Sequence, residues 1–140
     1  MDEDDFSNFI KKIQDKINKY EEEIYSKKVI YEYNNPNNFG TIKNPDAKAE
    51  IKGPCGDTMK IELKIKNDVI KDARFWTDGC GPTIACGNML TKLIKNNSIE
   101  YANNITDFKL LEALDDLPEN HRHCATLSVN TLRKALKNFK

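Results

Sequence analysis

Four cysteines are the side chains of this sequence best suited to chemistry: Cys55, Cys80, Cys86 and Cys124. Three of them stand where the backbone is expected to change direction, in Gly53-Pro54-Cys55-Gly56-Asp57, in Asp78-Gly79-Cys80-Gly81-Pro82, and at the start of a helix for Cys124. Glycines beside Cys55 and Cys80 remove bulk and let a ligand approach the sulfur. Cys80 and Cys124 lie near expected helix N-termini, where the helix dipole favours the thiolate. Because thiolates bind iron and zinc, the pattern indicates a soft-metal site.

The fourth cysteine, Cys86, has a different setting. At about 100° per residue it falls within the apolar arc of its helix, formed by Ala85, Met89, Leu90 and Leu93. A cysteine in that position behaves as a small hydrophobic residue, so Cys86 is predicted to lie in the core. The sequence contains no C-x-x-C pair of the zinc-ribbon kind, and spacing alone leaves both a metal site and scattered structural thiols open.

The composition narrows the setting in which these thiols act. A chain of 140 residues suits one domain with a core of its own, and its 22 basic and 22 acidic residues balance. Nothing in that balance predicts a nucleic acid or membrane partner. The acidic start, Met1-Asp2-Glu3-Asp4-Asp5, is unlike a secretory signal or a transit peptide. We therefore expect a cytoplasmic, reducing location, where cysteines serve as thiols or metal ligands.

The N-terminal part of the chain predicts a long amphipathic helix. Its apolar residues recur at steps of three and four from Phe6 to Ile24, with charged residues between them. We expect this helix to dock on the body through Phe6, Ile10, Ile13 and Ile17, with self-association into a homo-oligomer as the other way to cover the stripe. The segment 34–40 follows as a turn-rich linker.

The remaining elements predict an α+β fold. Residues 47–51 and 59–66 are strand-like, and Asn67-Asp68 should turn the chain into a third strand at residues 69–76. Helices are expected over residues 82–94, after the N-caps Ser98 and Thr106, and from Ala125 onwards. The prediction is a small antiparallel β-sheet covered on one face by helices, with an additional long N-terminal helix. We divide the chain into that helix, residues 1–30, and a domain over residues 31–140.

The local sequences around the three loop cysteines resemble the cysteine motifs of the IscU/NifU N-terminal family of iron-sulfur cluster assembly scaffolds, in order and at similar separation. The resemblance covers the chain from about Tyr33 and includes the family's N-P-R-N-x-G opening. Its motifs here are Asn34-Asn35-Pro36-Asn37-Asn38-Phe39-Gly40, Gly53-Pro54-Cys55-Gly56-Asp57, Asp72-Ala73-Arg74-Phe75, Asp78-Gly79-Cys80-Gly81 and His123-Cys124-Ala125-Thr126-Leu127.

The resemblance implies a set of site residues. Cys55, Cys80 and Cys124 would be cluster ligands, Asp57 would lie beside them, and His123 would be a fourth ligand. Three thiolates with one harder oxygen or nitrogen donor leave one position exchangeable, as a scaffold that releases its product needs. Two alternatives stay open, a surface turn for Asp57 and helix capping for His123. His121 has no family counterpart and is expected in solvent.

The resemblance also implies a function. A cysteine desulfurase would deliver sulfur as a persulfide to Cys124, iron and electron donor proteins would contribute, and a transient 2Fe-2S cluster would pass to recipient apoproteins. This is a scaffold and carrier, not an enzyme. The family's chaperone-binding segment is altered here, to Leu117-Pro118-Glu119-Asn120-His121.

Two alternative functions would use the same residues. The first is a sulfur-relay protein that works with a cysteine desulfurase and holds Zn²⁺ in the same site, since zinc and iron share these ligands. The second, a thiol enzyme using Cys124 with His123, is disfavoured because residues adjacent in sequence seldom give a base a good approach to a nucleophile.

Overall fold

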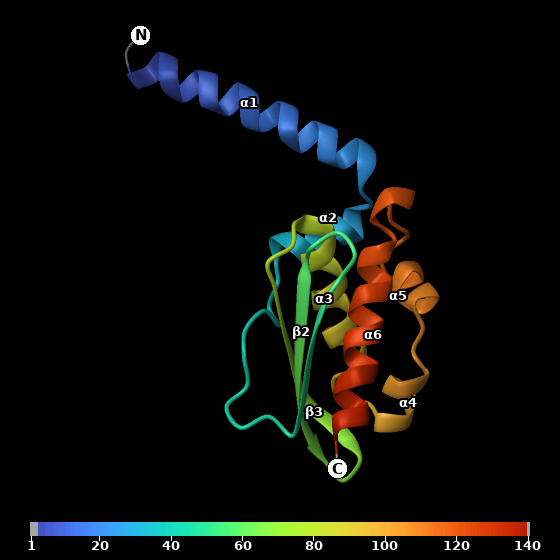
Figure 1. The fold of residues 1–140 in the computed structure, drawn as a ribbon. Helices are drawn as coiled ribbons and strands as arrows, with labels where there is room; N and C mark the ends of the chain where they lie inside the picture. The colour runs from blue at the N-terminus through green and yellow to red at the C-terminus, as the bar shows by residue number, and fades with distance from the viewer. Residues whose placement is uncertain (1–2, 140) are drawn as a thin grey trace.

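A computed structural model describes residues 3–139 of the chain. Its three-stranded antiparallel sheet has the order β1 (Ala47–Lys52), β2 (Thr58–Lys66) and β3 (Val69–Thr77). Two long helices, α3 (Gly81–Ile94) and α6 (His123–Asn138), pack side by side on one face of the sheet (Figure 1). The α+β fold expected from the sequence is confirmed.

The β2–β3 hairpin is built as its sequence predicts. Both turn residues, Asn67 and Asp68, have positive φ values of 54° and 62°, which Asn and Asp tolerate better than other non-glycine residues. The alternating apolar residues of β2 point into the core, where Met59, Ile61 and Leu63 are fully buried. The sheet therefore has a dry face for the helices.

Two short helices, α4 (Ile99–Asn104) and α5 (Asp107–Ala113), begin at the predicted caps. The Ser98 hydroxyl accepts a hydrogen bond from the Tyr101 amide at 3.0 Å, and the Thr106 hydroxyl accepts one from the Lys109 amide at 3.1 Å. Each cap satisfies one of the amides that a helix start leaves unpaired. A 3-10 turn, η1 (Glu119–His121), then leads into α6.

A further helix, α2 (Lys27–Asn34), was not foreseen. The sequence does contain an N-cap residue for this helix, Ser26, whose hydroxyl accepts a hydrogen bond from the Val29 amide at 3.1 Å. Packing against α3 buries Val29 and also Glu32, whose carboxylate binds Lys92 and Asn88. The chain therefore enters the body at α2.

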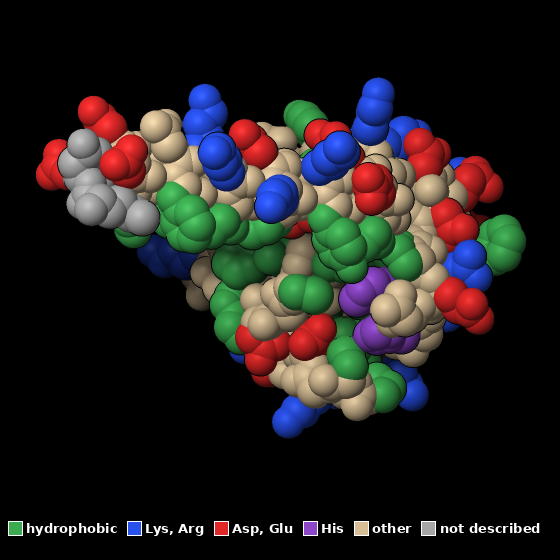
Figure 2. Space-filling model, turned by 90° about the horizontal axis from the view of Figure 1, so that it is seen from above, with side chains coloured by type: hydrophobic (Ala, Val, Ile, Leu, Met, Phe, Trp, Pro, Cys, Tyr) green, Lys and Arg blue, Asp and Glu red, His purple; other side chains and the backbone are tan. Residues whose placement is uncertain are grey.

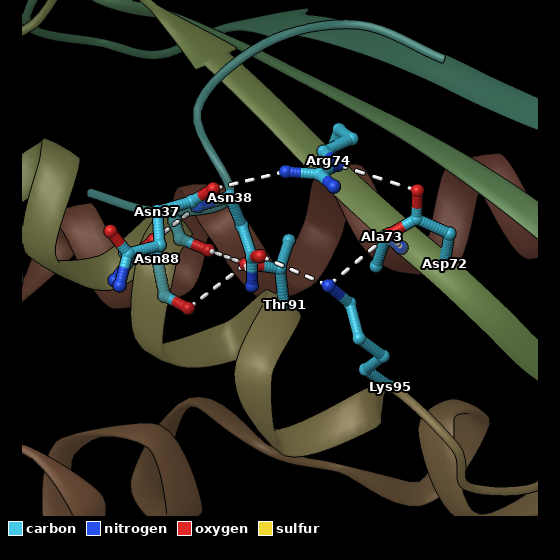
Figure 3. A network of polar contacts seen from close by, with 9 residues as sticks. Asn37, Asn38, Asp72, Ala73, Arg74, Asn88, Thr91 and Lys95 are labelled. Atoms are coloured by element: carbon cyan, nitrogen blue, oxygen red, sulfur yellow. Dashed lines mark hydrogen bonds and ion pairs between the residues drawn. The ribbon is translucent and has the colours of Figure 1, made fainter. Parts of the chain in front are cut away.

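A network of polar contacts fastens the linker after α2 to the body (Figure 3). Buried Asn38 donates two hydrogen bonds to residues of α3. Its backbone amide donates to the Asn88 Oδ1 at 3.0 Å, and its side-chain amide donates to the Thr91 hydroxyl at 3.1 Å. Lys95 closes the network by donating to the Asn38 Oδ1 at 3.0 Å and pairing with Asp72 of β3 at 3.2 Å. The linker thus holds α3 and β3 in one arrangement.

The N-terminal helix α1 (Glu3–Ile24) forms as predicted but does not dock on the body as expected. It extends away from the other elements in Figure 1, and none of its residues is buried. Its apolar stripe is exposed, from 40% for Ile13 to 64% for Tyr20. Figure 2 shows these side chains gathered along one side of the helix. The docking prediction is therefore wrong, because the core is already closed by α2, α3 and α6. No helix in residues 3–139 is long and apolar enough to cross a membrane.

Because α1 contributes nothing to the core, substitutions in its stripe should hardly change stability. We expect Ile13→Ser or Ile17→Ser to change the free energy of unfolding by less than about 0.5 kcal/mol. Leu132→Ala, in the fully buried part of α6, is the control and should cost about 2–5 kcal/mol. Denaturant unfolding measures both. If the stripe variants lose as much unfolding free energy as the control, α1 packs on the body in solution. Size-exclusion chromatography of the same proteins tests self-association.

Candidate metal centre

Three segments that are distant in the sequence meet at one end of the sheet (Figure 1). They are the β1–β2 turn at residues 53–57, the loop at residues 78–80 after β3, and the first turn of α6. Two hydrogen bonds at the adjoining strand ends hold the first two segments together: the Thr58 amide donates to Asp78 at 2.7 Å, and the Thr77 hydroxyl donates to the Thr58 carbonyl at 2.6 Å. The sheet thus brings together the predicted cysteine loops.

The β1–β2 turn presents Cys55 at its tip. The Gly53 amide donates to the Asp57 carbonyl at 2.7 Å, and the Gly56 amide donates to the Gly53 carbonyl at 3.0 Å, which closes the turn. Gly56 has a φ of +95°, a conformation that other residues rarely adopt. Cys55 is left exposed, with its sulfur directed towards α6.

A continuous series of contacts joins four of the predicted site residues. The Cys55 Sγ lies 3.2 Å from the His123 Nε2, which lies 3.8 Å from the Cys124 Sγ. The Thr83 hydroxyl then bridges two of them, at 3.3 Å from the Cys124 Sγ and 3.1 Å from the Asp57 Oδ2. Cys55, His123, Cys124 and Asp57 are therefore neighbours.

Cys80 lies on the rim of this group. It is the N-cap residue of α3, is exposed, and makes no side-chain capping bond. After the larger effect of burial, negative charge on Cys80, Cys55 and Asp57 acts to raise the pKa of the Cys124 thiol. Within residues 3–139, no group of three or more His, Cys, Asp or Glu side chains is arranged so that it could hold a metal ion. Soft thiols beside an imidazole and a carboxylate suit iron or zinc chemically, and the ligand set stays a prediction.

The protonation state of Cys124 differs from the one expected from the sequence. It was predicted to favour the thiolate because a helix begins beside it, but it is only 2% exposed. Burial raises the pKa of the Cys124 thiol to about 11. Desolvation thus outweighs the helix dipole, and Cys124 is a neutral thiol at neutral pH. A cation that binds the sulfur must displace this proton.

Cys86 lies in the core, as its helical position predicted. It is fully buried, and burial raises the pKa of its thiol well above the ordinary value. A neutral, enclosed thiol of this kind serves as packing.

Two features of the centre were missed in the sequence. Thr83 was not singled out, although it lies one helical turn after Cys80, on the same side of α3. His121 was expected in solvent but is half-buried, with its ring centroid 6.0 Å from that of Tyr25 and 6.5 Å from that of His123. The wall of the centre is therefore more aromatic than the motifs indicate.

Comparison with known proteins finds relatives over most of the chain. The profile of the NifU-like N terminal domain matches residues 24–140. The iron-sulfur cluster assembly scaffold protein IscU of Aquifex aeolicus is 39% identical over 118 residues, covering 82% of this chain and 75% of that protein. The Escherichia coli K12 protein of the same name is 36% identical over 121 residues, covering 83% of this chain and 94% of its own.

Solved structures share the fold. The N-terminal part of a NifU-like protein from Brucella abortus superposes with a TM-score of 0.64 at 18% identity, covering 81% of this chain and 92% of that chain. A putative iron-sulfur cluster assembly scaffold protein for the SUF system from Fervidobacterium islandicum gives a TM-score of 0.65 at 21% identity, covering 80% and 96%. At these identities the likeness concerns the fold alone.

The raised pKa of Cys124 predicts how the metal-free protein reacts with iodoacetamide. Only the thiolate is alkylated, so the rate at Cys124 should rise about tenfold per pH unit between about pH 7 and 10. Exposed Cys55 and Cys80 should react before it, and Cys86 only after unfolding. Peptide-resolved mass spectrometry measures all four rates in one sample. A plateau for Cys124 below about pH 9 would contradict the assigned protonation state.

Proposed function

The chain belongs to the family of NifU-like N terminal domains, and we propose that it is an iron-sulfur cluster assembly scaffold. The observation that carries the proposal is the meeting of the Cys55 turn, the Cys80 loop and Cys124 at one end of the sheet. Loop thiols at the end of a rigid scaffold, with Cys55 and Cys80 exposed, suit a cargo that must be loaded and released. In this role the protein carries its product and turns over no substrate.

We assign the cargo to three sulfur ligands, Cys55, Cys80 and Cys124. A 2Fe-2S cluster needs one more donor, and the contacts offer two for that position. His123 lies between Cys55 and Cys124, and Asp57 reaches Cys124 through Thr83. An imidazole or carboxylate is a harder ligand than a thiolate, so iron bound there exchanges more readily.

The sulfur supply sets a structural requirement. In the proposed sequence a cysteine desulfurase transfers persulfide sulfur to Cys124, and an electron donor then reduces that sulfur to sulfide as iron binds. Cys124 is 2% exposed; its Sγ lies 3.8 Å from the His123 Nε2, and the Cys55 Sγ lies 3.2 Å from the same nitrogen. A persulfide therefore reaches Cys124 only after His123 or the turn at residues 53–57 moves. The unit that does this work begins at α2, which packs on α3, and leaves α1 outside it.

Anaerobic reconstitution tests the proposal. The full-length protein is supplied with ferrous iron, cysteine, a cysteine desulfurase and a reductant for the persulfide sulfur, and absorption spectroscopy follows the formation of a 2Fe-2S chromophore. Transfer to an apo-ferredoxin completes the test. Elemental analysis of anaerobically purified protein separates iron from zinc, which binds the same donors. A protein that holds zinc and accepts persulfide, but forms no chromophore, would be the sulfur relay instead.

Single cysteine substitutions should distinguish the three cluster ligands from the core cysteine. Cys55→Ser, Cys80→Ser and Cys124→Ser should each abolish a stable cluster, because each removes one of three sulfur ligands. Cys86→Ser is the matched control: it should keep the cluster and lose about 1–3 kcal/mol of unfolding free energy, since it places a hydroxyl in an apolar site. Absorbance per chain and denaturant unfolding give the two readings. Equal cluster loss in all four variants would refute the separation of Cys86 from the site.

Asp57 should control how long the cluster stays. A carboxylate ligand is more exchangeable than a thiolate, so Asp57→Ala should accept a cluster completed by His123 or an external thiol and hold it longer than the parent protein does. The half-life against an apo-ferredoxin acceptor measures this. Asp46→Ala, a carboxylate at the other end of the sheet, serves as the control. Loss as fast as in the parent would make Asp57 a structural residue.

A further inference from the structure

Thr83 occupies a place in the centre that none of the cysteine motifs explains. It is fully buried in the first turn of α3, and its hydroxyl is within hydrogen-bond distance of both Asp57 and Cys124. These two residues come from different parts of the chain, the β1–β2 turn and α6. The Thr83 side chain is thus the link between them.

The hydrogen-bonding capacity of the three groups fixes their order. A threonine hydroxyl has one proton to donate, and an ionised carboxylate can only accept. Thr83 therefore donates to the Asp57 Oδ2 and accepts from the thiol of Cys124. In this order each proton has an acceptor, and the buried hydroxyl is satisfied on both sides.

The surroundings of Asp57 show why the hydroxyl matters. Among residues 3–139, Thr83 is the hydrogen-bond donor that reaches the Asp57 carboxylate. Gly79 makes room for it: a Cβ at this position would lie 2.8 Å from both the Asp57 Oδ2 and the Thr83 Oγ1. Asp57 is half-buried, so without the Thr83 bond its carboxylate can turn into water.

From this geometry we propose that Thr83 is a positioning residue that holds the Asp57 carboxylate beside Cys124. Its effect on cargo rests on the proposed scaffold function: a carboxylate held at the site competes for iron, whereas one that has turned into water does not. Thr83→Val keeps the shape and removes the hydroxyl. Its cluster should therefore live severalfold longer than the parent's, like that of Asp57→Ala.

The first experiment needs no cargo. Infrared spectroscopy of the metal-free protein detects the S–H stretch of Cys124, assigned from its absence in Cys124→Ser, and hydrogen bonding lowers the frequency of that stretch. Thr83→Val should shift the band to higher frequency, whereas Thr83→Ser, which keeps a hydroxyl, should leave it in place. Thr131→Val removes another fully buried hydroxyl, on α6, and should not move it.

The second experiment measures cluster half-life against an apo-ferredoxin. We expect Thr83→Val to lengthen it severalfold, Thr83→Ser to restore the parent value, and Thr83→Val to add nothing in the Asp57→Ala background. A Thr83→Ser protein that behaves like Thr83→Val would overturn the proposal, because packing and not the hydroxyl would then matter. So would additive effects of Thr83→Val and Asp57→Ala.

The two experiments separate this inference from the proposed function. If the parent protein assembles no cluster, the scaffold proposal fails, while the infrared bands still decide whether Thr83 binds Cys124. If Thr83→Val does not fold, the parent's own S–H band decides: a frequency as high as that of a thiol without a hydrogen bond overturns the proposal.

Discussion

The antiparallel register of the sheet is the constraint on which the site depends. Met59, near the start of β2, pairs with Ile51 near the end of β1 and with Thr77 at the end of β3. The turn before β2 and the loop after β3 must therefore meet at the same end, which brings Cys55 close to Cys80. Packing of α6 along β1 and β2 then places Cys124 at that end too. A shift of one residue in the register would turn the strand's side chains to the opposite face of the sheet.

The motif residues of the linker have a structural task distinct from the chemistry of the cysteines. Asn38 makes buried hydrogen bonds to α3, Lys95 joins Asn38 to Asp72 of β3 through partly exposed contacts, and Arg74 donates to the Asn37 carbonyl at 2.9 Å (Figure 3). Both Asn38 and Arg74 lie in segments whose sequences resemble motifs of the family. Since α3 begins immediately after Cys80, an arrangement that fixes α3 against β3 also fixes the Cys80 loop. Polar networks of this kind select one packing among several apolar alternatives.

Features set by local sequence could be predicted, and features set by tertiary contacts could not. The Asn67-Asp68 turn, the caps Ser98 and Thr106, and the inward position of Cys86 follow from short-range rules, and the structure confirms them. The burial of Cys124 depends on groups contributed by α3 and the β1–β2 turn, so the helix dipole alone gave the wrong protonation state. The exposure of α1 likewise depends on whether the core has room for it. Thr83 combines both kinds of feature. Its position on the same side of α3 as Cys80 follows from helical spacing, whereas its contacts with Asp57 and Cys124 depend on the tertiary fold.

The unequal exposure of the thiols also bears on oxidative damage. Peroxides attack thiolates that solvent can reach, and the first product, a sulfenic acid, condenses with a neighbouring thiol. Cys55 and Cys80 are exposed on the rim, whereas Cys124 is enclosed and protonated at neutral pH. Oxidants therefore meet the rim thiols first, at positions that reductants can also reach. We therefore expect the enclosed sulfur to be oxidised more slowly by peroxide than the two rim thiols.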